Sequence, residues 1–474
     1  MKQLTLLFAL CLVLLASCRQ AEVPTQYTDS SQLPKMYPDY VDVTIPVNIA
    51  PLSMELRQQA QDVVVRYAAG GEEIVCGGKK AMPDIDDWKA LASKAAGSDI
   101  TVEVFAKNDD KWTRFKPFAI HVSKDSIDPY ISYRLIAPSY VTYEELTINQ
   151  RCLENYDESV IYNNMLLSVE TEGQCINCHN YQAYNPNRMQ FHARQNHGGT
   201  VVAYDGKVKK VNMKNDSILS AGVYPAWHPW LKLIAYSTNK TMQSFHTRDI
   251  NKIEVFDSQS DLIIYDVDKD EVTNIENDST EFECYPAWSP DGKWLYYVSA
   301  HFEFRDTIPH ETECVKRSKE IKYSIYRKSF NPETMQFGPR EMVFDAASLG
   351  KSATLPRISP DGKYLLFSMG EWGCFHIWHR DADLYMLRLA DNKVWPLIKT
   401  NSPQAESFHN FSSNGKWIIF SSRRNDGDYT RLFFAHVDAD GNTTKAFELP
   451  QEDPDYHRMF MKSYNIPEFM RGPV

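Results

Sequence analysis

The sequence lacks two features that mark large classes of protein, an excess of basic residues and a long apolar run. Its 474 residues include 51 Lys and Arg against 62 Asp and Glu, which gives a net charge of −11. Nucleic-acid-binding proteins need a basic surface, so this balance argues against a nucleic-acid partner. Beyond the N-terminus no segment is long and apolar enough to cross a bilayer. A G-x-S-x-G nucleophile elbow is also absent from the sequence, which argues against a serine hydrolase.

The N-terminus carries one short apolar run. Lys2 precedes apolar residues 4–16, a run too short to span a membrane but typical of a signal peptide, predicted as residues 1–17. The ending "LASC" resembles the lipobox of bacterial lipoproteins, in which the signal is cut before the cysteine and that cysteine carries lipid. The resemblance implies lipidation of Cys18 and an exported lipoprotein, anchored to a membrane on the periplasmic side or at the cell surface. The alternative is an ordinary secretory signal in which Cys18 occurs by chance.

The first part of the mature chain is predicted to contain a tether and a small β-rich domain. Residues 18–44 are polar and contain proline, which is typical of a tether, and residues 45–140 contain β-like segments. One helix is expected at residues 84–97, capped by Asp84 or Asp86. Its apolar face is predicted to consist of Trp88, Leu91, Ala92 and Ala95. A hairpin with its turn at "KNDDK" is expected to follow.

The second half of the chain contains a repeat. Its four copies are "YPAWHPWLKLIAYSTN" from Tyr224, "YPAWSPDGKWLYYVSA" from Tyr285, "LPRISPDGKYLLFSMG" from Leu355 and "FHNFSSNGKWIIFSSR" from Phe408. Each copy has an aromatic or apolar start, then Ser-Pro-Asp-Gly-Lys or a variant of it, then an apolar β-like run. Pro fixes φ, Asp closes the turn and Gly takes the positive φ, so the pattern predicts a β-hairpin. The first copy departs from the pattern with "HPWLK", which leaves its turn type open.

These hairpins resemble the repeats of TolB-type propellers. The resemblance implies a mainly β fold, with a TolB-like β-propeller at residues 199–450 after the smaller β-rich N-terminal domain with its one helix, and a C-terminal tail at 451–474. The number of blades stays open, because four hairpins are visible, "GGTVVAYDGKVKKVNM" matches part of a fifth, and TolB-type propellers often have six blades. Separate β-sandwiches on a string are the alternative architecture.

Between the two domains, residues 141–198 contain "CINCH", which is Cys175 to His179. A thioredoxin-type redox pair lies at a helix N-terminus within a βαβ pattern, and nothing around Cys175 alternates strand and helix in that way. A zinc site needs a second pair of ligands. His192 and His197 complete a C-x2-C…H-x4-H pattern with Cys175 and Cys178, so zinc is the alternative cofactor.

Covalent haem c is the cofactor that the spacing and the signal peptide predict together. The thiols of Cys175 and Cys178 would form thioethers with the haem vinyl groups, and His179 would be the proximal iron ligand. Export would deliver the chain to the compartment where c-type haem is attached. The candidates for the sixth ligand all lie in the adjacent segment "NRMQFHARQNHGGT", and His192, flanked by Phe191, is the first choice. The alternatives for that ligand are His197, Met189 and an open or water-bound position.

Signal peptide, CxxCH motif and repeats together resemble a family of exported bacterial lipoproteins that place one haem-c motif before a TolB-like propeller. Some members are labelled cytochrome c biosynthesis proteins. The stretches that carry the resemblance are "VTIPVNIAP", "DPYISYRLI", "NYDESVIYNN", "CINCHN", "FHARQNHGGT", "DGDYTRLFFAHVDADGNTTKAFELPQEDP" and "KSYNIPE". The resemblance implies one-electron transfer, or haem held in a membrane-associated redox complex, with a redox protein docking on the propeller. An electron-transfer or binding protein is favoured over an enzyme. A different class stays open: a non-redox TolB-like binding or scaffold lipoprotein whose CxxCH forms a disulfide or a zinc clip.

Five further cysteines lie outside the signal peptide, the lipid site and the motif. They are Cys76, Cys152, Cys284, Cys314 and Cys374. An oxidising compartment permits disulfides, but an odd number cannot all pair within the chain, and the sequence assigns no bridge.

Overall fold

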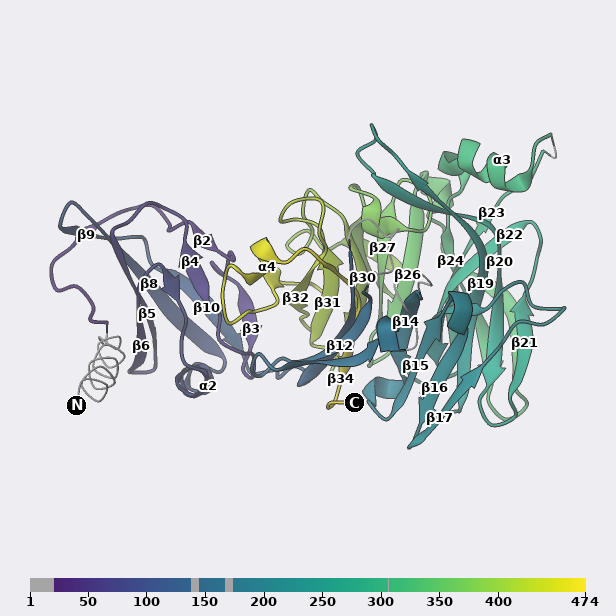
Figure 1. Ribbon diagram of the computed structural model, residues 1–474, viewed down its shortest axis with the longest axis horizontal. Coiled ribbons are helices and arrows are strands. Elements are labelled where there is room, and N and C mark those ends of the chain that lie inside the picture. Colours follow the sequence, from purple (N-terminus) through teal and green to yellow (C-terminus); the bar gives the residue numbers. More distant parts are fainter. Residues whose placement is uncertain (1–20, 138–144, 167–173, 306) are drawn as a thin grey trace, which may run out of the picture. The chain divides into compact units, whose positions relative to one another are not determined.

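The computed structural model describes residues 21–137, 145–166, 174–305 and 307–474, and the chain is mainly β in these ranges (Figure 1). It forms two compact units. One comprises the chain up to Lys124 together with Pro450–Met459, and the other comprises Asp125–Leu449 together with Phe460–Val474. No helix in the described ranges is long and apolar enough to cross a membrane. The predicted signal peptide and Cys18 lie outside these ranges.

The first unit is built on a seven-stranded and a three-stranded sheet. The larger sheet has the order β1-β9-β8-β10-β3, and β5 pairs with both β8 and β6. The smaller sheet has the order β2-β4-β7. The strands are β1 (Thr28–Asp29), β2 (Met36–Tyr37), β3 (Thr44–Pro46), β4 (Met54–Leu56), β5 (Asp62–Ala69), β6 (Glu72–Gly77), β7 (Lys80–Ala81), β8 (Ser98–Asn108), β9 (Lys111–Arg114) and β10 (Phe118–Ser123).

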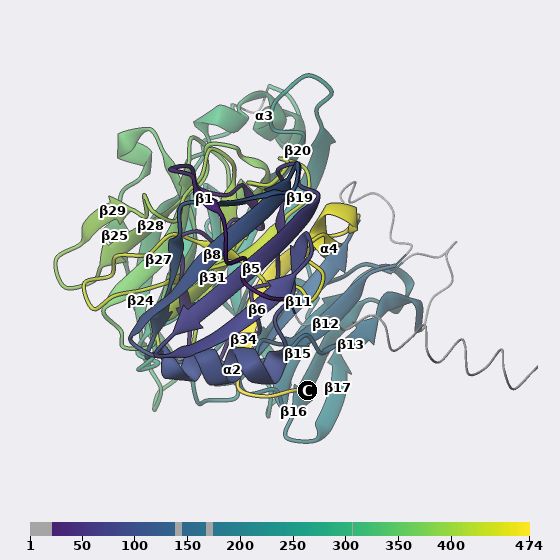
Figure 2. The same cartoon turned by 90° about the vertical axis from the view of Figure 1, so that its left-hand side faces the viewer.

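The helix α2 (Ile85–Lys94) confirms the one helix expected in this unit. The Asp84 carboxylate accepts from the backbone N–H of Asp86 and caps the first turn. Trp88 and Leu91 are buried on the face that contacts β5 and β6 (Figure 2). The indole N–H of Trp88 donates to the carbonyl of Ile49 at 3.1 Å. The expected hairpin follows as β8 and β9.

Part of the segment expected to be a tether belongs to the core of this unit. β1 pairs with β9 and β2 with β4, while Tyr40 and Val43 are fully buried. The polar composition of residues 18–44 conceals these few apolar side chains, each of which fills a core position. The C-terminal helix α4 (Tyr456–Met459) lies in the same unit, where Asp453 pairs with Lys80 at 2.7 Å.

The second unit contains, within its described residues, six four-stranded antiparallel blades. Blade 1 consists of β34 (Ser463–Met470), β11 (Tyr130–Ile136), β12 (Thr147–Cys152) and β13 (Glu158–Asn163). Blade 2 consists of β14 (Ile176–Tyr181), β15 (Arg188–Ala193), β16 (Gly199–Tyr204) and β17 (Lys207–Val211). Blade 3 consists of β18 (Gly222–Trp227), β19 (Leu233–Phe245), β20 (Ile253–Asp266) and β21 (Glu271–Glu276).

Blades 4 to 6 follow in chain order. Blade 4 consists of β22 (Glu281–Trp288), β23 (Trp294–His301), β24 (Ser324–Asn331) and β25 (Gln336–Phe344), and one parallel bridge joins its sheet to blade 3. Blade 5 consists of β26 (Ser352–Ile358), β27 (Tyr364–Gly370), β28 (Asp383–Arg388) and β29 (Lys393–Pro396). Blade 6 consists of β30 (Glu406–Phe411), β31 (Trp417–Ser422), β32 (Arg431–His436) and β33 (Phe447–Glu448). Short helices in the loops are η2 (Asn164–Leu166), η3 (Gln182–Tyr184), η4 (Gln195–His197), α3 (His310–Lys316), η5 (Ser318–Glu320), η6 (Ala347–Leu349) and η7 (His376–Trp378).

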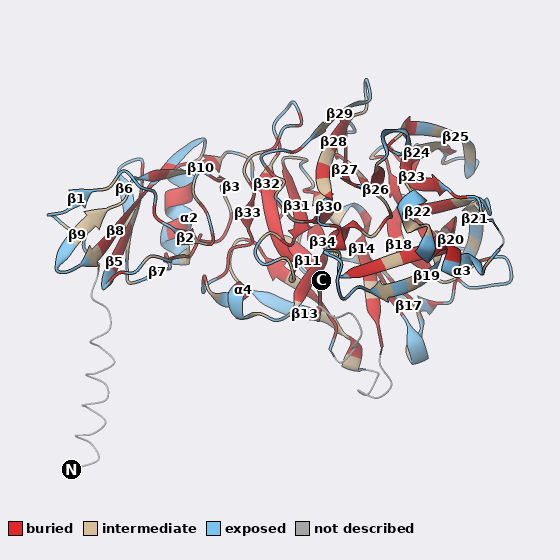
Figure 3. Ribbon diagram, turned by 90° about the horizontal axis from the view of Figure 1, so that it is seen from above, coloured by how far each residue is buried: buried red, intermediate tan, exposed pale blue. Residues whose placement is uncertain are grey.

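The innermost strands of the six blades, called the ring strands, together form a closed ring. β14 contacts β18, β18 contacts β22, β22 contacts β26, β26 contacts β30, β30 contacts β34, and β34 contacts β14. This closed radial arrangement is a β-propeller. The six ring strands are largely buried, whereas outer strands such as β13 and β17 are mostly exposed (Figure 3).

The propeller extends beyond the range expected from the repeats at both ends. Residues 141–198, expected as a separate attachment segment, supply strands of blades 1 and 2, and the expected tail supplies β34. β34 pairs with β11, so the two ends of this unit close the ring in one blade. The hairpin "GGTVVAYDGKVKKVNM" is β16 and β17 of blade 2.

The Ser-Pro-Asp-Gly turns have the hydrogen bonds that the sequence predicts. In blade 5 the hydroxyl of Ser359 donates to Asp361 at 2.6 Å, and Gly362 has a φ of 71°. In blade 3 the departure at "HPWLK" places His228 where the other copies have serine. Its Nδ1 accepts from the backbone N–H of Leu231 at 3.0 Å, so the imidazole closes this turn.

Candidate functional site

The six ring strands share a β-bulge at the same position. Its first residue has a positive φ of 46–56° in every strand, and the pairing with the next strand of the blade skips the bulge. These residues are Ile466, Cys178, Tyr224, Tyr285, Leu355 and Phe408, from blade 1 to blade 6.

The residue after the bulge is proline in four blades and histidine in the other two. The prolines are Pro225, Pro286, Pro356 and Pro467, and the histidines are His179 and His409. Cys178 and His179 of the CxxCH motif therefore occupy the positions that hold Tyr-Pro in blades 3 and 4. The segments "CHNY" and "IPEF" are the fifth and sixth copies of the repeat start. Sequence reasoning missed them because no Ser-Pro-Asp-Gly turn follows either segment.

The ring encloses a central channel with a narrow middle. The middle cavity measures about 30 Å³, room for little more than a water molecule, and it is lined by the bulge residues and those after them. It shares Arg357 and Glu468 with a wide mouth of about 370 Å³. It shares Tyr224, Phe408 and Ile466 with a smaller mouth of about 120 Å³.

The predicted haem anchors lie in the wall of this channel, but they face different cavities. Cys178 and His179 line the narrow middle, whereas Cys175 lines the smaller mouth beside Arg134 and Arg194. Both cysteines are buried, and all seven cysteines within the described ranges are free thiols. Burial, together with the charge of Arg134, lowers the pKa of His179 to about 3. His179 is therefore a neutral imidazole, and neither ring nitrogen makes a well-formed hydrogen bond.

The candidates for the sixth ligand lie elsewhere. His192 on β15 pairs across from Asn177, and its Nδ1 lies 3.2 Å from the hydroxyl of Thr200. Burial lowers the pKa of His192 to about 4. Met189 packs in the apolar core, and His197 is partly exposed in η4. None of the three lines the cavities that hold Cys175, Cys178 and His179. Across the described ranges no three His, Cys, Asp or Glu side chains form a group that could hold a metal ion, so the predicted zinc ligands are not brought together.

The folded channel does not fit a covalently attached haem. Pockets that bury ligands of drug-like size measure roughly 300–1,000 Å³, and the cavity at Cys178 and His179 measures about 30 Å³. The two thiols also line different parts of the channel, Cys178 the narrow middle and Cys175 the smaller mouth. The haem assignment stays a prediction of the sequence.

In each ring strand, the residue that follows the Pro or His after the bulge lines the wide mouth. From blade 1 to blade 6 these residues are Glu468, Asn180, Ala226, Ala287, Arg357 and Asn410. The two alanines lie opposite Asn410 and Glu468 in the ring order. Four of these six residues are polar and form one side of the mouth, the polar half, whereas the two alanines leave the other side open.

Glu468 is the centre of the polar half. Its Oε1 accepts from Asn180 Nδ2 at 3.1 Å and from Arg357 Nη2 at 3.3 Å, and its Oε2 accepts from Asn410 Nδ2. Burial raises the pKa of Glu468, and the charge of Arg357 opposes that rise. Both carboxylate oxygens are thus occupied by protein donors.

The remaining wall of the wide mouth is aromatic and basic. Trp227 and Trp288 line the side of the two alanines. Arg471 follows β34, donates its backbone N–H to the carbonyl of Tyr184 at 3.0 Å, and holds its guanidinium 5.9 Å from the centre of the Tyr184 ring. The mouth offers flat apolar faces and guanidinium donors, a combination suited to binding.

The smaller mouth is walled by the long hairpin of β19 and β20. Thr241 and Gln243 on β19 line this cavity together with Cys175. The hairpin is held to blade 5 by Glu254, whose Oε2 lies 2.5 Å from Nε2 of the fully buried His379. Lys252 pairs with Asp428 of the loop after β31.

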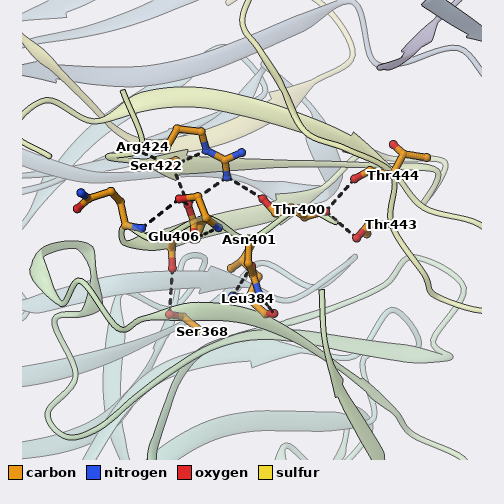
Figure 4. A network of polar contacts seen from close by, with 11 residues as sticks. Ser368, Leu384, Thr400, Asn401, Glu406, Ser422, Arg424, Thr443 and Thr444 are labelled. Carbon is orange, nitrogen blue, oxygen red and sulfur yellow. Dashed lines mark hydrogen bonds and ion pairs between the residues drawn. The ribbon is translucent and has the colours of Figure 1, made fainter. Parts of the chain in front are cut away.

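A buried ion pair of blade 6 lies outside the channel in a polar network that reaches blade 5, where the Ser368 hydroxyl donates to the carbonyl of Glu406 at 3.1 Å (Figure 4). The carboxylate of Glu406 accepts from Arg424 Nη2 at 3.0 Å and from the hydroxyls of Ser402 and Ser422 at 2.6 and 2.8 Å. Arg424 also donates to the carbonyl of Thr400 at 2.7 Å. Every partner belongs to the protein, so this group is a structural link between blades.

Comparisons with known proteins give likenesses in fold. No protein-family model and no curated protein matches the chain. A structure from work on two prolyl endopeptidases is 11% identical with a TM-score of 0.35, covering 68% of this chain and 42% of that one. A GH74 enzyme of Niastella koreensis is 10% identical with a TM-score of 0.38, covering 67% of this chain and 46% of that one. The Cps50 (Swd1) β-propeller domain of Myceliophteria thermophila is 10% identical with a TM-score of 0.34, covering 80% and 97%. The chain thus spans less than half the length of the first two. The propeller assignment is based on the six blades of this chain and on their closed ring.

Proposed function

We propose that this chain is an exported, lipid-anchored binding protein whose propeller takes a small ligand in the wide mouth of its central channel. The main support for this proposal is the asymmetry of the mouth, which has polar side chains on one side and two alanines on the other. Ala226 and Ala287 leave open a cavity of about 370 Å³, within the range of roughly 300–1,000 Å³ that buries small ligands. The sequence "LASC" supports the proposed location, since it resembles a lipobox that ends at Cys18.

The groups at this mouth favour binding over catalysis. Both oxygens of Glu468 are occupied by protein donors, so this carboxylate is poorly placed to act as a general base. The aromatic wall and the guanidinium of Arg357 remain to contact a ligand. This is the non-redox binding class that the sequence left open.

Filling the open half of the mouth tests the proposal. Ala287→Leu would occupy the cavity that a ligand needs, whereas Ala439→Leu places the same side chain at an exposed turn and serves as the matched control. Small molecules that raise the melting temperature of the wild-type chain should lose this effect with Ala287→Leu and keep it with Ala439→Leu. Ala226→Leu repeats the test if Ala287→Leu does not fold. Equal stabilisation of the wild type and a folded filled variant would overturn the proposal.

A further inference from the structure

The wide mouth has unpaired hydrogen-bond donors but no spare carboxylate. Arg357 donates to Glu468 through Nη2 alone within the described residues, although a guanidinium has five N–H donors. The Arg357 side chain is 23% exposed and lines the cavity, so its other N–H groups can reach a ligand. Glu468, in contrast, has donors on both oxygens. This asymmetry selects for a ligand that accepts hydrogen bonds.

Arg471 adds a second positive charge to the same cavity. It is exposed and forms no ion pair among the described residues, and the Asp128 carboxylate that its charge acts on already accepts from the backbone N–H and hydroxyl of Ser413. Arg357 and Arg471 together face the single carboxylate of Glu468, so the charged groups lining the mouth sum to about +1. A ligand with a single negative charge would balance them.

We infer that the ligand carries a carboxylate, which Arg357 and Arg471 bind while its organic body lies against Trp227 and Trp288. This inference rests on the proposed function of the wide mouth. A guanidinium binds a carboxylate with two parallel N–H···O bonds, and the single excess charge matches a carboxylate better than a doubly charged phosphate. The free C-terminus of a peptide and a sugar acid both offer this chemistry.

Paired probes test the charge and distinguish the two sources. Isothermal titration of the full mature chain would compare Ala-Phe with Ala-Phe amide, galacturonate with galactose, and both acids with inorganic phosphate. At least one acid should bind, and its neutral partner should bind at least roughly tenfold more weakly, because a hydrogen bond to a charged group is lost. Binding of an acid no tighter than its neutral partner, tighter binding of phosphate, or binding of neither acid would overturn the inference.

Substitution of the two arginines locates the contact. Arg471→Gln leaves the polar half ring intact, and it should weaken binding of the preferred acid roughly 10- to 100-fold. Arg357→Gln should weaken it at least as much, and Arg388→Gln, at the end of β28 with its side chain 40% exposed and outside this mouth, is the control with unchanged affinity. Unchanged affinity in a folded Arg471→Gln would overturn the role of Arg471. If Ala287→Leu abolishes binding but acid and amide bind the wild type equally well, the wide mouth remains the binding site and the carboxylate inference is wrong.

Discussion

At position 179 the chain has histidine where four other ring strands have proline. The β14–β15 pairing skips residues 178 and 179, so the backbone there follows the bulge common to all six blades. We therefore expect His179→Pro to fold, with a free energy of unfolding within about 1 kcal/mol of the wild type, because proline also restricts the unfolded chain. Urea unfolding measures the change. His179→Asp is the contrasting variant and should be strongly destabilising, since it buries an unpaired carboxylate.

A test for covalent haem separates the two interpretations of the motif. Expressed with its signal in a host competent for cytochrome c maturation, the wild type should show no c-type α-band in the pyridine haemochrome spectrum, since the folded channel has no room for a porphyrin. A band that survives acid–acetone extraction and disappears in Cys175→Ala/Cys178→Ala would contradict this expectation and restore the haem assignment.

His409 gives the second prediction at the scale of a single residue. Its Nε2–H donates to the carbonyls of Leu355 and Leu366 at 2.7 and 3.2 Å, and burial lowers its pKa to about 3. Below pH 6.5 the unfolded chain binds a proton that the folded chain does not, so stability falls as the pH falls. His409→Gln should reduce the slope of unfolding free energy between pH 4 and 6 by about 1.4 kcal/mol per pH unit. Urea titrations across this range measure it, and an unchanged slope would show that His409 titrates normally.

Residue chemistry alone could not identify the role of the CxxCH motif. Spacing and export pointed to haem, whereas Cys178 and His179 also satisfy the shorter pattern of apolar residue, Pro or His, any residue, aromatic. Three of the four copies from Tyr224 to Phe408 match that pattern, and the copy from Leu355 has Ile358 in place of the aromatic residue. Its extension to "CHNY" needed the structure, because the adjacent loop lacks the turn residues that mark the other copies.

At the scale of elements, the polar network between blades 5 and 6 contains one buried charge pair, whose two members both belong to blade 6. The Glu406 side chain is fully buried and that of Arg424 is 18% exposed. Glu406→Gln should lower the free energy of unfolding by about 3 kcal/mol, because the guanidinium loses its counter-charge in a poorly solvated position. The shift of the urea midpoint measures the loss. Asp391→Asn breaks the exposed pair with Arg388 and should leave the midpoint unchanged.

The sequence predicts those elements that are marked by nearby residues, such as a helix cap or the residues of a tight turn. The Asp84 cap and the apolar face of α2 predicted the helix, and the Ser-Pro-Asp-Gly turns predicted the hairpins. Strands without such turns, including β14 and β34, depend on pairing partners distant in sequence, which single-sequence patterns do not encode.

At the scale of the whole molecule, the ring closes only through the C-terminal strand. β34 supplies the ring strand of blade 1, while β11, β12 and β13 come from the other end of the same unit. A tail of mixed polarity gave no sign of this role, because Tyr464, Phe469 and Met470 become apolar core only when β34 lies between β11 and its neighbours in the ring.

Removal of β34 should therefore destabilise the propeller as a whole. Tyr464, Phe469 and Met470 are all buried, and each contributes roughly 1.5–3 kcal/mol, a sum that approaches the typical net stability of a domain of about 5–15 kcal/mol. A chain ending at Lys462 should lose its cooperative thermal transition, because blades 2 and 6 lose the strand between them. Removal of Gly472–Val474 alone is the control and should leave the transition in place. A peptide of residues 460–474 added in trans should restore it, since β34 pairs with β11 through its backbone. A cooperative transition at the wild-type temperature without β34 would instead mean that five blades and three strands of the sixth form a stable open ring.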